Sequence, residues 1–187
     1  SPSPWAADEV TRAIELGFVP EYLQSDYQEP VTRSQFIELA LNFLSVQYHY
    51  GGDFDDSDFC EPTPSIKANY RQDIFTDTQN DDDLNWAFAL GIVGGRGDGT
   101  FGPLDGITRQ EAAKVLMNTY AVYGDEPADG GEGSALSVAF SDEAEIASWA
   151  RDSVSALYDW GVLGGCGNGL FEPEGQFTRE QCIVAFL

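Results

Sequence analysis

GIVGGRGDGTFGPLDGITR, residues 91–109, returns 70 residues later as GVLGGCGNGLFEPEGQFTR, residues 161–179. Both stretches open with glycines, continue through Gly-x-Gly-x-Phe-x-Pro and end in Thr-Arg. The positions that agree without a gap are Gly91, Gly94, Gly95, Gly97, Gly99, Phe101, Pro103, Thr108 and Arg109, which match Gly161, Gly164, Gly165, Gly167, Gly169, Phe171, Pro173, Thr178 and Arg179. Such a repeat predicts a fold built from copies of one supersecondary unit that pack on one another.

A weaker third copy begins the chain. Its Trp5-Ala6 corresponds to Trp149-Ala150, and its Thr32-Arg33 corresponds to the Thr-Arg end of the other copies. This copy is two residues shorter between its glycine and its arginine, and it lacks the Gly-x-Gly-x-Phe turn. We therefore expect a single domain, residues 1–187, with three units near 5–46, 75–123 and 140–187 and acidic connectors at 47–74 and 124–139.

Each unit has the pattern of a helix, a loop and a second helix. In the third unit, apolar residues recur at three- and four-residue steps, and Gly161 follows them as a glycine does past a helix end. The second helix of every unit begins with a capping-box pattern, Thr followed three residues later by Glu or Gln. The pairs are Thr32 and Gln35, Thr108 and Glu111, and Thr178 and Gln181. The predicted fold class is therefore mainly α, with room for short strand pairings in the loops.

Composition and charge exclude several classes of function. The chain has 187 residues, of which 42% are hydrophobic, enough for a packed core. Its net charge of −23 opposes nucleic-acid binding, because phosphate contacts need clustered Lys and Arg. No apolar run approaches the roughly 20 residues of a membrane span, so no membrane insertion is expected. The first residue is Ser1 rather than Met, which suggests a processed or trimmed N-terminus with any signal peptide outside this numbering.

The sequence carries no recognisable catalytic or metal-binding motif. It has one histidine, His49, and neither His-Glu-x-x-His nor Gly-x-Ser-x-Gly, so we expect no enzyme and assign no cofactor. An acidic run in the first connector lacks the glycine at the sixth position of an EF-hand loop. We interpret it as a solvated loop rather than a cation site; its acids are Asp53, Asp55, Asp56, Asp58 and Glu61.

Three cysteines without a Cys-x-x-Cys pair form neither a zinc site nor a disulfide framework. Cys182 aligns with the apolar positions Phe36 and Ala112, so it is expected to be buried. The sequence leaves open whether Cys60 and Cys166 form a disulfide bridge.

The motifs resemble the S-layer homology domain family. The resemblance is carried by Phe-x-Asp at residues 75–77 and 140–142, by the two glycine-rich loops and by the three Thr-Arg helix starts. Three tandem copies are also the usual arrangement in that family, although the first copy here is a partial match. The resemblance implies a pseudo-threefold helical spindle on a secreted protein of the bacterial cell surface or cell wall. It also implies non-covalent attachment to a secondary cell-wall polysaccharide, often one that carries pyruvate ketals.

The same resemblance implies which residues line the grooves between units. In the family they are the Arg of the Thr-Arg start, the Asp of Phe-x-Asp, a nearby Trp and loop glycines. Carried onto this sequence they are Arg33, Arg109, Arg179, Asp77, Asp142, Trp5, Trp149, Gly99 and Gly169.

The residues themselves leave two partners open for the three arginines. A cation in the first turn of a helix opposes the macrodipole by roughly 0.3–1 kcal/mol, so its recurrence indicates an anionic partner. That partner is either internal, in a salt bridge to Asp77 or Asp142, or a carboxylate or phosphate on a glycan. The two tryptophans are likewise either core residues or sugar-stacking platforms, whereas Phe101 and Phe171 are expected to pin the loops onto the core.

These observations lead us to expect a non-catalytic module that anchors a protein to the cell wall through an anionic polysaccharide bound in inter-unit grooves. The strong negative charge gives no long-range steering, so binding should not weaken steeply with added salt. The degenerate first unit and the acidity also fit an alternative, a structural or protein-interaction module that kept the fold and lost glycan binding.

Overall fold

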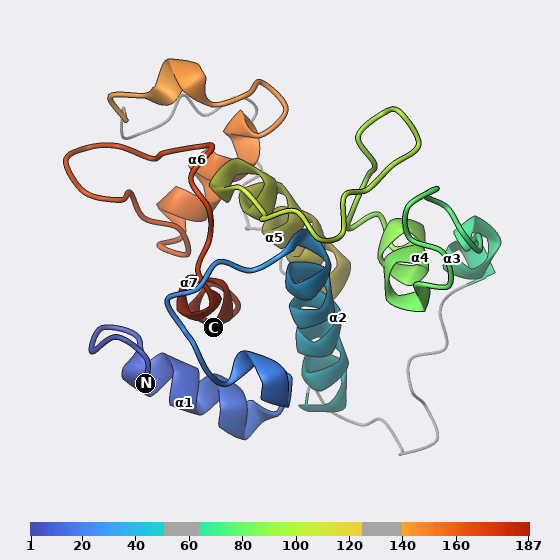
Figure 1. The fold of residues 1–187 in the computed structure, drawn as a ribbon, viewed down its shortest axis with the longest axis horizontal. Coiled ribbons are helices and arrows are strands. Elements are labelled where there is room, and N and C mark those ends of the chain that lie inside the picture. The colour runs from blue at the N-terminus through green and yellow to red at the C-terminus, as the bar shows by residue number, and fades with distance from the viewer. Residues whose placement is uncertain (51–63, 125–139) are drawn as a thin grey trace.

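The computed structural model describes residues 1–50, 64–124 and 140–187, and this part of the chain is mainly helical (Figure 1). Its α-helices are α1 (Ala7–Leu16), α2 (Arg33–Tyr50), α3 (Pro64–Asn69), α4 (Asp82–Ala89), α5 (Arg109–Tyr123), α6 (Arg151–Asp159) and α7 (Arg179–Val184). Two 3-10 helices, η1 (Glu21–Leu23) and η2 (Glu143–Glu145), join them. Within these residues the strand pairings amount to isolated bridges, so the mainly α fold class is confirmed.

Below, α1 with α2 is called unit 1, α4 with α5 unit 2, and α6 with α7 unit 3. All three second helices begin with the capping box that the sequence predicts. Thr108 and Thr178 each form both reciprocal bonds with the residue three positions on. In unit 1 the Thr32 N–H donates to Gln35 at 3.0 Å, and the Gln35 N–H donates to the Thr32 hydroxyl at 3.2 Å. Each box satisfies helix N–H groups that would otherwise lack partners.

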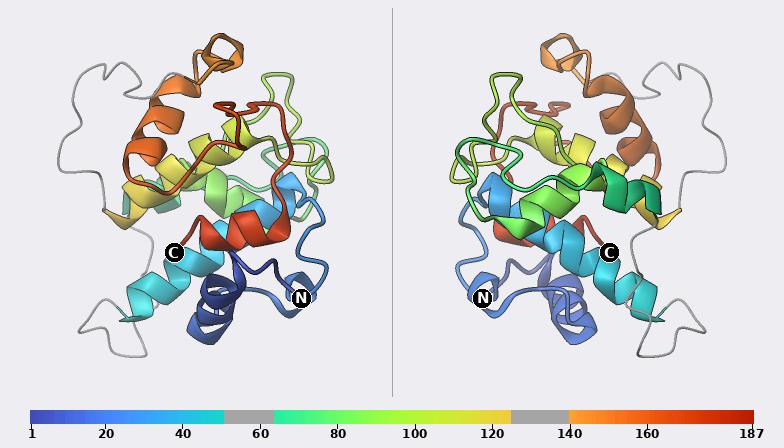
Figure 2. Two further views of the ribbon diagram at one scale, coloured as in Figure 1. Left: turned by 90° about the vertical axis from the view of Figure 1, so that its left-hand side faces the viewer. Right: turned by 90° about the vertical axis from the view of Figure 1, so that its right-hand side faces the viewer.

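The second helices α2, α5 and α7 gather at the centre of the molecule, and the first helices α1, α4 and α6 lie around them (Figures 1 and 2). The most extensive helix contacts join different units: α1 packs on α7, α4 on α2, and α6 on α5. The helices α2 and α5 also pack on each other. Each first helix is therefore covered by the second helix of another unit. A unit thus depends on its neighbours to bury its apolar face.

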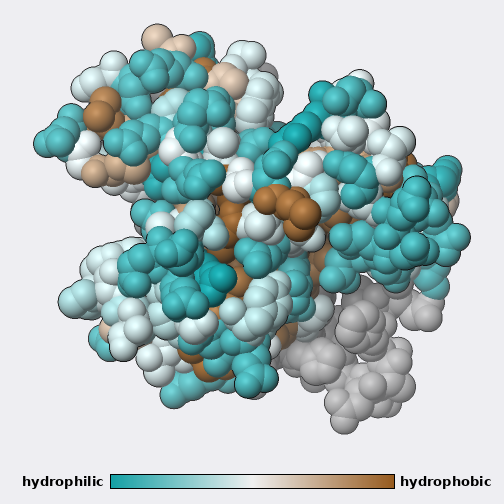
Figure 3. Space-filling view, viewed as in Figure 1, coloured by the Kyte–Doolittle hydropathy of each residue, from teal (hydrophilic) through white to brown (hydrophobic). Residues whose placement is uncertain are grey.

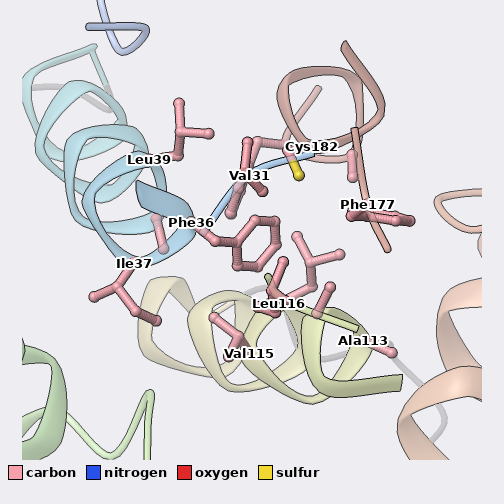
Figure 4. Packing of buried hydrophobic residues seen from close by; sticks show 14 of the residues in the cluster. Val31, Phe36, Ile37, Leu39, Ala113, Val115, Leu116, Phe177 and Cys182 are labelled. Carbon is pink, nitrogen blue, oxygen red and sulfur yellow. The ribbon is translucent and has the colours of Figure 1, made fainter. Parts of the chain in front are cut away.

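The core lies where the three second helices meet (Figure 4). Phe36 on α2, Leu116 on α5 and Cys182 on α7 are fully buried in one cluster. Cys182 thus occupies the apolar position that its alignment predicts. Figure 3 shows a largely hydrophilic surface, with hydrophobic residues visible mainly near the centre, between the lobes.

A closed ring of three backbone hydrogen bonds lies at the junction of the units. The Val31 N–H donates to the Phe177 carbonyl at 3.0 Å, Phe177 to Ile107 at 3.3 Å, and Ile107 to Val31 at 3.1 Å. Each residue immediately precedes the Thr cap of a second helix, so the ring relates the three units by an approximate threefold axis. The first N–H groups of the second helices, at Arg33, Arg109 and Arg179, donate to carbonyls of the next unit's loop.

Some sequence-based expectations fall outside the described residues. These are the acidic run in the first connector and Cys60, and with Cys60 any bridge to Cys166. Among the helices that the structure describes, none is long and apolar enough to cross a membrane. The described ranges also contain no group of His, Cys, Asp or Glu side chains arranged to hold a metal ion.

Candidate functional site

The aspartates of the two Phe-x-Asp motifs hold the glycine-rich turns of their own units. Asp142 accepts the Phe171 N–H at 2.9 Å and the Glu172 N–H at 2.7 Å, and Asp77 accepts the matching pair in unit 2 at 2.9 and 2.8 Å. Burial opposes ionisation of Asp142, but these N–H donors outweigh it and lower its pKa. In the described residues neither carboxylate forms the salt bridge to an arginine that the sequence left open as the internal alternative.

Phe101 and Phe171 anchor the same turns on the core, as predicted. Both rings are buried, and they pack on Phe75 and Phe140 at centroid separations of 5.3 and 5.4 Å. Gly99 and Gly169 lie in the turns with φ of 88° and 74°, a region that side chains disfavour. Their carbonyls accept the N–H of Thr76 and Ser141, the middle residues of the Phe-x-Asp motifs.

The first two arginines bind the turn of the following unit. Arg33 donates from Nε to the Phe101 carbonyl at 3.0 Å, lies 4.5 Å from the centroid of that ring and forms a salt bridge to Glu111. Arg109 donates from Nε to the Phe171 carbonyl at 2.7 Å and lies 4.9 Å from that ring. The two residues are only 8% and 5% exposed, and their side chains mainly join one unit to the next.

Arg179 closes the cycle onto unit 1 with weaker contacts. It donates to the Ser25 carbonyl at 2.8 Å and lies 4.0 Å from a carboxylate oxygen of Asp26. Its Nε is buried without a hydrogen-bond partner in the described part of the chain. The cause is that unit 1 lacks the Gly-x-Gly-x-Phe turn whose carbonyl accepts this donor in the other two units.

A cavity of about 460 Å³ opens between units 1 and 2. We call it the Trp149 cavity. Helix α2 contributes Arg33 and Ile37 to it, the unit 2 loop contributes Arg96 and Phe101, and α5 contributes Glu111 and Lys114. Trp149 of unit 3 completes the lining. Of the residues proposed from the sequence, Arg33 and Trp149 meet here, whereas Arg109, Arg179, Asp77, Asp142, Trp5, Gly99 and Gly169 are not among the lining residues.

The two tryptophans are exposed at the surface. Trp149 is 51% and Trp5 is 55% solvent-exposed, so the interpretation of these residues as core is wrong. Each lies just before the first helix of its unit, where the preceding segment binds the start of another unit's second helix. The Ala147 N–H donates to Gln110 at 2.9 Å, and correspondingly the Ser3 N–H donates to Glu180 at 2.8 Å. Trp149 of unit 3 therefore lies beside the cavity between units 1 and 2.

Three charged residues at this cavity were not identified from the sequence as groove residues. Glu111 was assigned to the capping box alone, yet it also neutralises Arg33. Arg96 pairs with Asp105 at 2.6 Å across the same turn. Lys114 is exposed on α5 and has neither a hydrogen bond nor an ion pair in the described part of the chain. Alignment of the three units could have identified Lys114, because it stands at a fixed distance after the Thr cap. At this position the other units carry different residues.

The repeat of helix pairs, the clamped glycine turns and the arginine contacts define a modular domain with a cavity between two of its units. The S-layer homology domain matches residues 74–113 and 139–182. Two of the three units, unit 2 and unit 3, are therefore S-layer homology domains. Domains of this family are cell-surface anchoring modules that generally bind cell-wall polymers.

Comparison with characterised proteins places this chain within much longer relatives. It is 27% identical over 184 residues to an amylopullulanase of Thermoanaerobacterium thermosulfurigenes, covering 96% of this chain and 9% of that protein. It is 25% identical over 184 residues to the exoglucanase XynX of Acetivibrio thermocellus, covering 96% and 15%. An S-layer protein of Bacillus licheniformis is 29% identical over 99 residues, which is 53% of this chain and 10% of that protein. The chain thus spans a small part of each relative.

Proposed function

We propose that this module anchors a protein to the cell wall by binding an anionic wall polysaccharide in the Trp149 cavity. The observation that carries the proposal is a half-exposed tryptophan at the edge of a cavity of about 460 Å³. A Trp ring offers a large rigid apolar face with a polar edge, and a sugar ring with its C–H face turned inward suits that surface. The family assignment supports a wall polymer as the partner.

The charges around the cavity support an acidic glycan rather than a neutral one. Arg33, Arg96 and Lys114 bring three of the chain's nine basic residues to a single cavity in a protein of net charge −23. Arg33 is paired with Glu111 and Arg96 with Asp105, so among the described lining residues Lys114 carries the unpaired positive charge. Because exposed charges are screened beyond ~8 Å at physiological salt, attraction acts only at contact, and salt should weaken binding moderately.

The test is co-sedimentation of the module with purified cell walls, comparing Trp149→Ala with Trp5→Ala. Both tryptophans are about equally exposed, so the second variant controls for loss of a surface aromatic residue. Removing the Trp149 ring should weaken binding about tenfold, because its contact area no longer leaves water, while Trp5→Ala should keep most of the binding. Absence of sedimentation of the parent would refute wall binding, and equal sedimentation of Trp149→Ala and the parent would refute the assignment to this cavity.

One observation favours a second candidate, a structural or protein-interaction module without glycan binding. Arg33 and Arg109 are buried in contacts between units, so their recurrence is accounted for without a ligand. A melting curve with and without wall polysaccharide separates the two functions, since a ligand that binds the folded state raises the midpoint. An unchanged midpoint at saturating polysaccharide would favour this second function.

A further inference from the structure

The three second helices differ in charge at one equivalent position. Glu38, Lys114 and Val184 each stand six residues after the Thr cap of a second helix. The approximate threefold axis therefore places them at equivalent positions of the three junctions between units. Residues that differ so sharply in charge would give the three junctions unequal affinity for a charged ligand.

In the Trp149 cavity this position is a cation without a partner. Lys114 is exposed at the cavity and has no hydrogen bond or ion pair within the described residues. Glu111, one turn earlier on the same helix, is already engaged by Arg33 and by the Thr108 N–H. The Lys114 ammonium is thus free to contact a ligand.

The junction of units 3 and 1 has the opposite character. Glu38 accepts a hydrogen bond from Tyr22, and Asp83 of α4 lies close enough to Glu38 for the two carboxylates to repel each other. Arg179, the cation of this junction, has the carbonyl of Ser25 and the carboxylate of Asp26 as its partners. An anion would meet several carboxylates here and little free positive charge.

Resting on the proposed function, we infer that Lys114 is the residue that recognises the acidic group of the wall polysaccharide, and that it makes the Trp149 cavity the groove that selects an anionic sugar. The ammonium contacts the carboxylate or phosphate while the Trp149 ring packs on the sugar. The junction of units 3 and 1 does not take the anionic ligand, because Glu38 replaces the lysine there.

The experiment measures the affinity of the parent, Lys114→Gln and Arg12→Gln for wall polysaccharide extracted from Acetivibrio thermocellus and from Bacillus licheniformis. Arg12 is exposed on α1 and is not among the residues lining the cavity, so Arg12→Gln matches the change in net charge. We expect Lys114→Gln to bind about tenfold more weakly, the usual effect of losing a charge-assisted hydrogen bond, and Arg12→Gln to bind as the parent does. Both substitutions are at exposed sites, and unchanged melting curves would verify folding.

Chemically modified polysaccharide identifies the acidic group. The two treatments are amidation of carboxylates by carbodiimide and removal of phosphate by hydrofluoric acid. One of them should lower the affinity of the parent to that of Lys114→Gln. The same treatment should leave the affinity of Lys114→Gln unchanged. Equal binding of Lys114→Gln and the parent would overturn the inference while leaving wall binding intact. A tenfold loss in Lys114→Gln that persists unchanged after both treatments would also overturn it. Failure of the parent to bind either native polysaccharide would refute the proposed function, and this inference with it.

Discussion

Replacing Glu111 with Gln separates two roles that one carboxylate performs. Glu111 accepts the Thr108 N–H at 3.0 Å as part of the capping box, and it neutralises Arg33 of the neighbouring unit. A glutamine keeps the first role, since Gln35 and Gln181 form the same box in the other units. The substitution therefore removes the charge of the pair and leaves the helix cap.

The expected cost follows from the burial of the two side chains. The Arg33 side chain is 10% exposed and the Glu111 side chain 27%. Exposed ion pairs are worth up to about 1 kcal/mol, and breaking a buried pair costs about 3–5 kcal/mol. Arg33 keeps its bond to the Phe101 carbonyl, and the glutamine oxygen can still accept from it. We therefore expect a loss of about 1–2 kcal/mol, or a Tm lower by about 2–8 °C for a domain of this size.

Thermal and urea unfolding followed by circular dichroism measure this difference. Glu111→Ala removes the cap as well, so it should cost about 1 kcal/mol more than Glu111→Gln. Stability of Glu111→Gln equal to that of the parent would refute the reasoning that the inter-unit ion pair contributes to folding. Equal stability of the two variants would refute the claim that the capping box contributes separately.

Three further predictions concern the turns. In Gly165→Ala a Cβ would lie 2.7 Å from a backbone carbonyl oxygen, so its Tm should fall well below that of Gly164→Ala, whose Cβ meets nothing within 4 Å, in a thermal melt of both. The pKa of Asp142 in the folded state is lowered from 3.8, so the ionised carboxylate stabilises the fold fully above pH 3.8, and this stabilisation is lost as pH falls through the folded-state pKa. The difference in Tm between the parent and Asp142→Asn should therefore narrow as pH falls over this range, in thermal melts at stepped pH. Arg109→Lys should cost about 2 kcal/mol in urea unfolding, because the bond from Nε to a carbonyl is lost, and Arg179→Lys should cost less, because its Nε has no partner among the described residues.

Local sequence patterns predicted the helix starts and the turn anchors correctly. A capping box needs a threonine and a residue three positions later, so Thr108 with Glu111 determines its own geometry. Phe101 was likewise recognisable as an anchor, because an aromatic residue between turn glycines has little to pack on except the core. These features are formed by residues close together in the sequence, so the sequence alone is enough to predict them.

Contacts between units could not be read from the sequence in the same way. The apolar stripe of α1 shows that one face is buried, but not that α7 covers it. The recurrence of Arg33 indicated an anionic partner, yet the groups it binds are Glu111 and a carbonyl, which lie far along the chain. Trp149 fitted both a core and a surface role, because an aromatic residue at the start of a helix satisfies either pattern until its neighbours are placed.

The ring formed by Val31, Phe177 and Ile107 also sets the number of repeats. Each of these residues donates one N–H and offers one carbonyl, and all three donors and acceptors are used within the ring. In an open solenoid the last repeat leaves a surface on which another can stack. Here the donor of the first unit is satisfied by the carbonyl of the third, so a fourth copy added by gene duplication would find no unpaired edge. It would have to begin a second ring or remain unpaired, which makes the triplet, rather than the single repeat, the unit that evolution can copy.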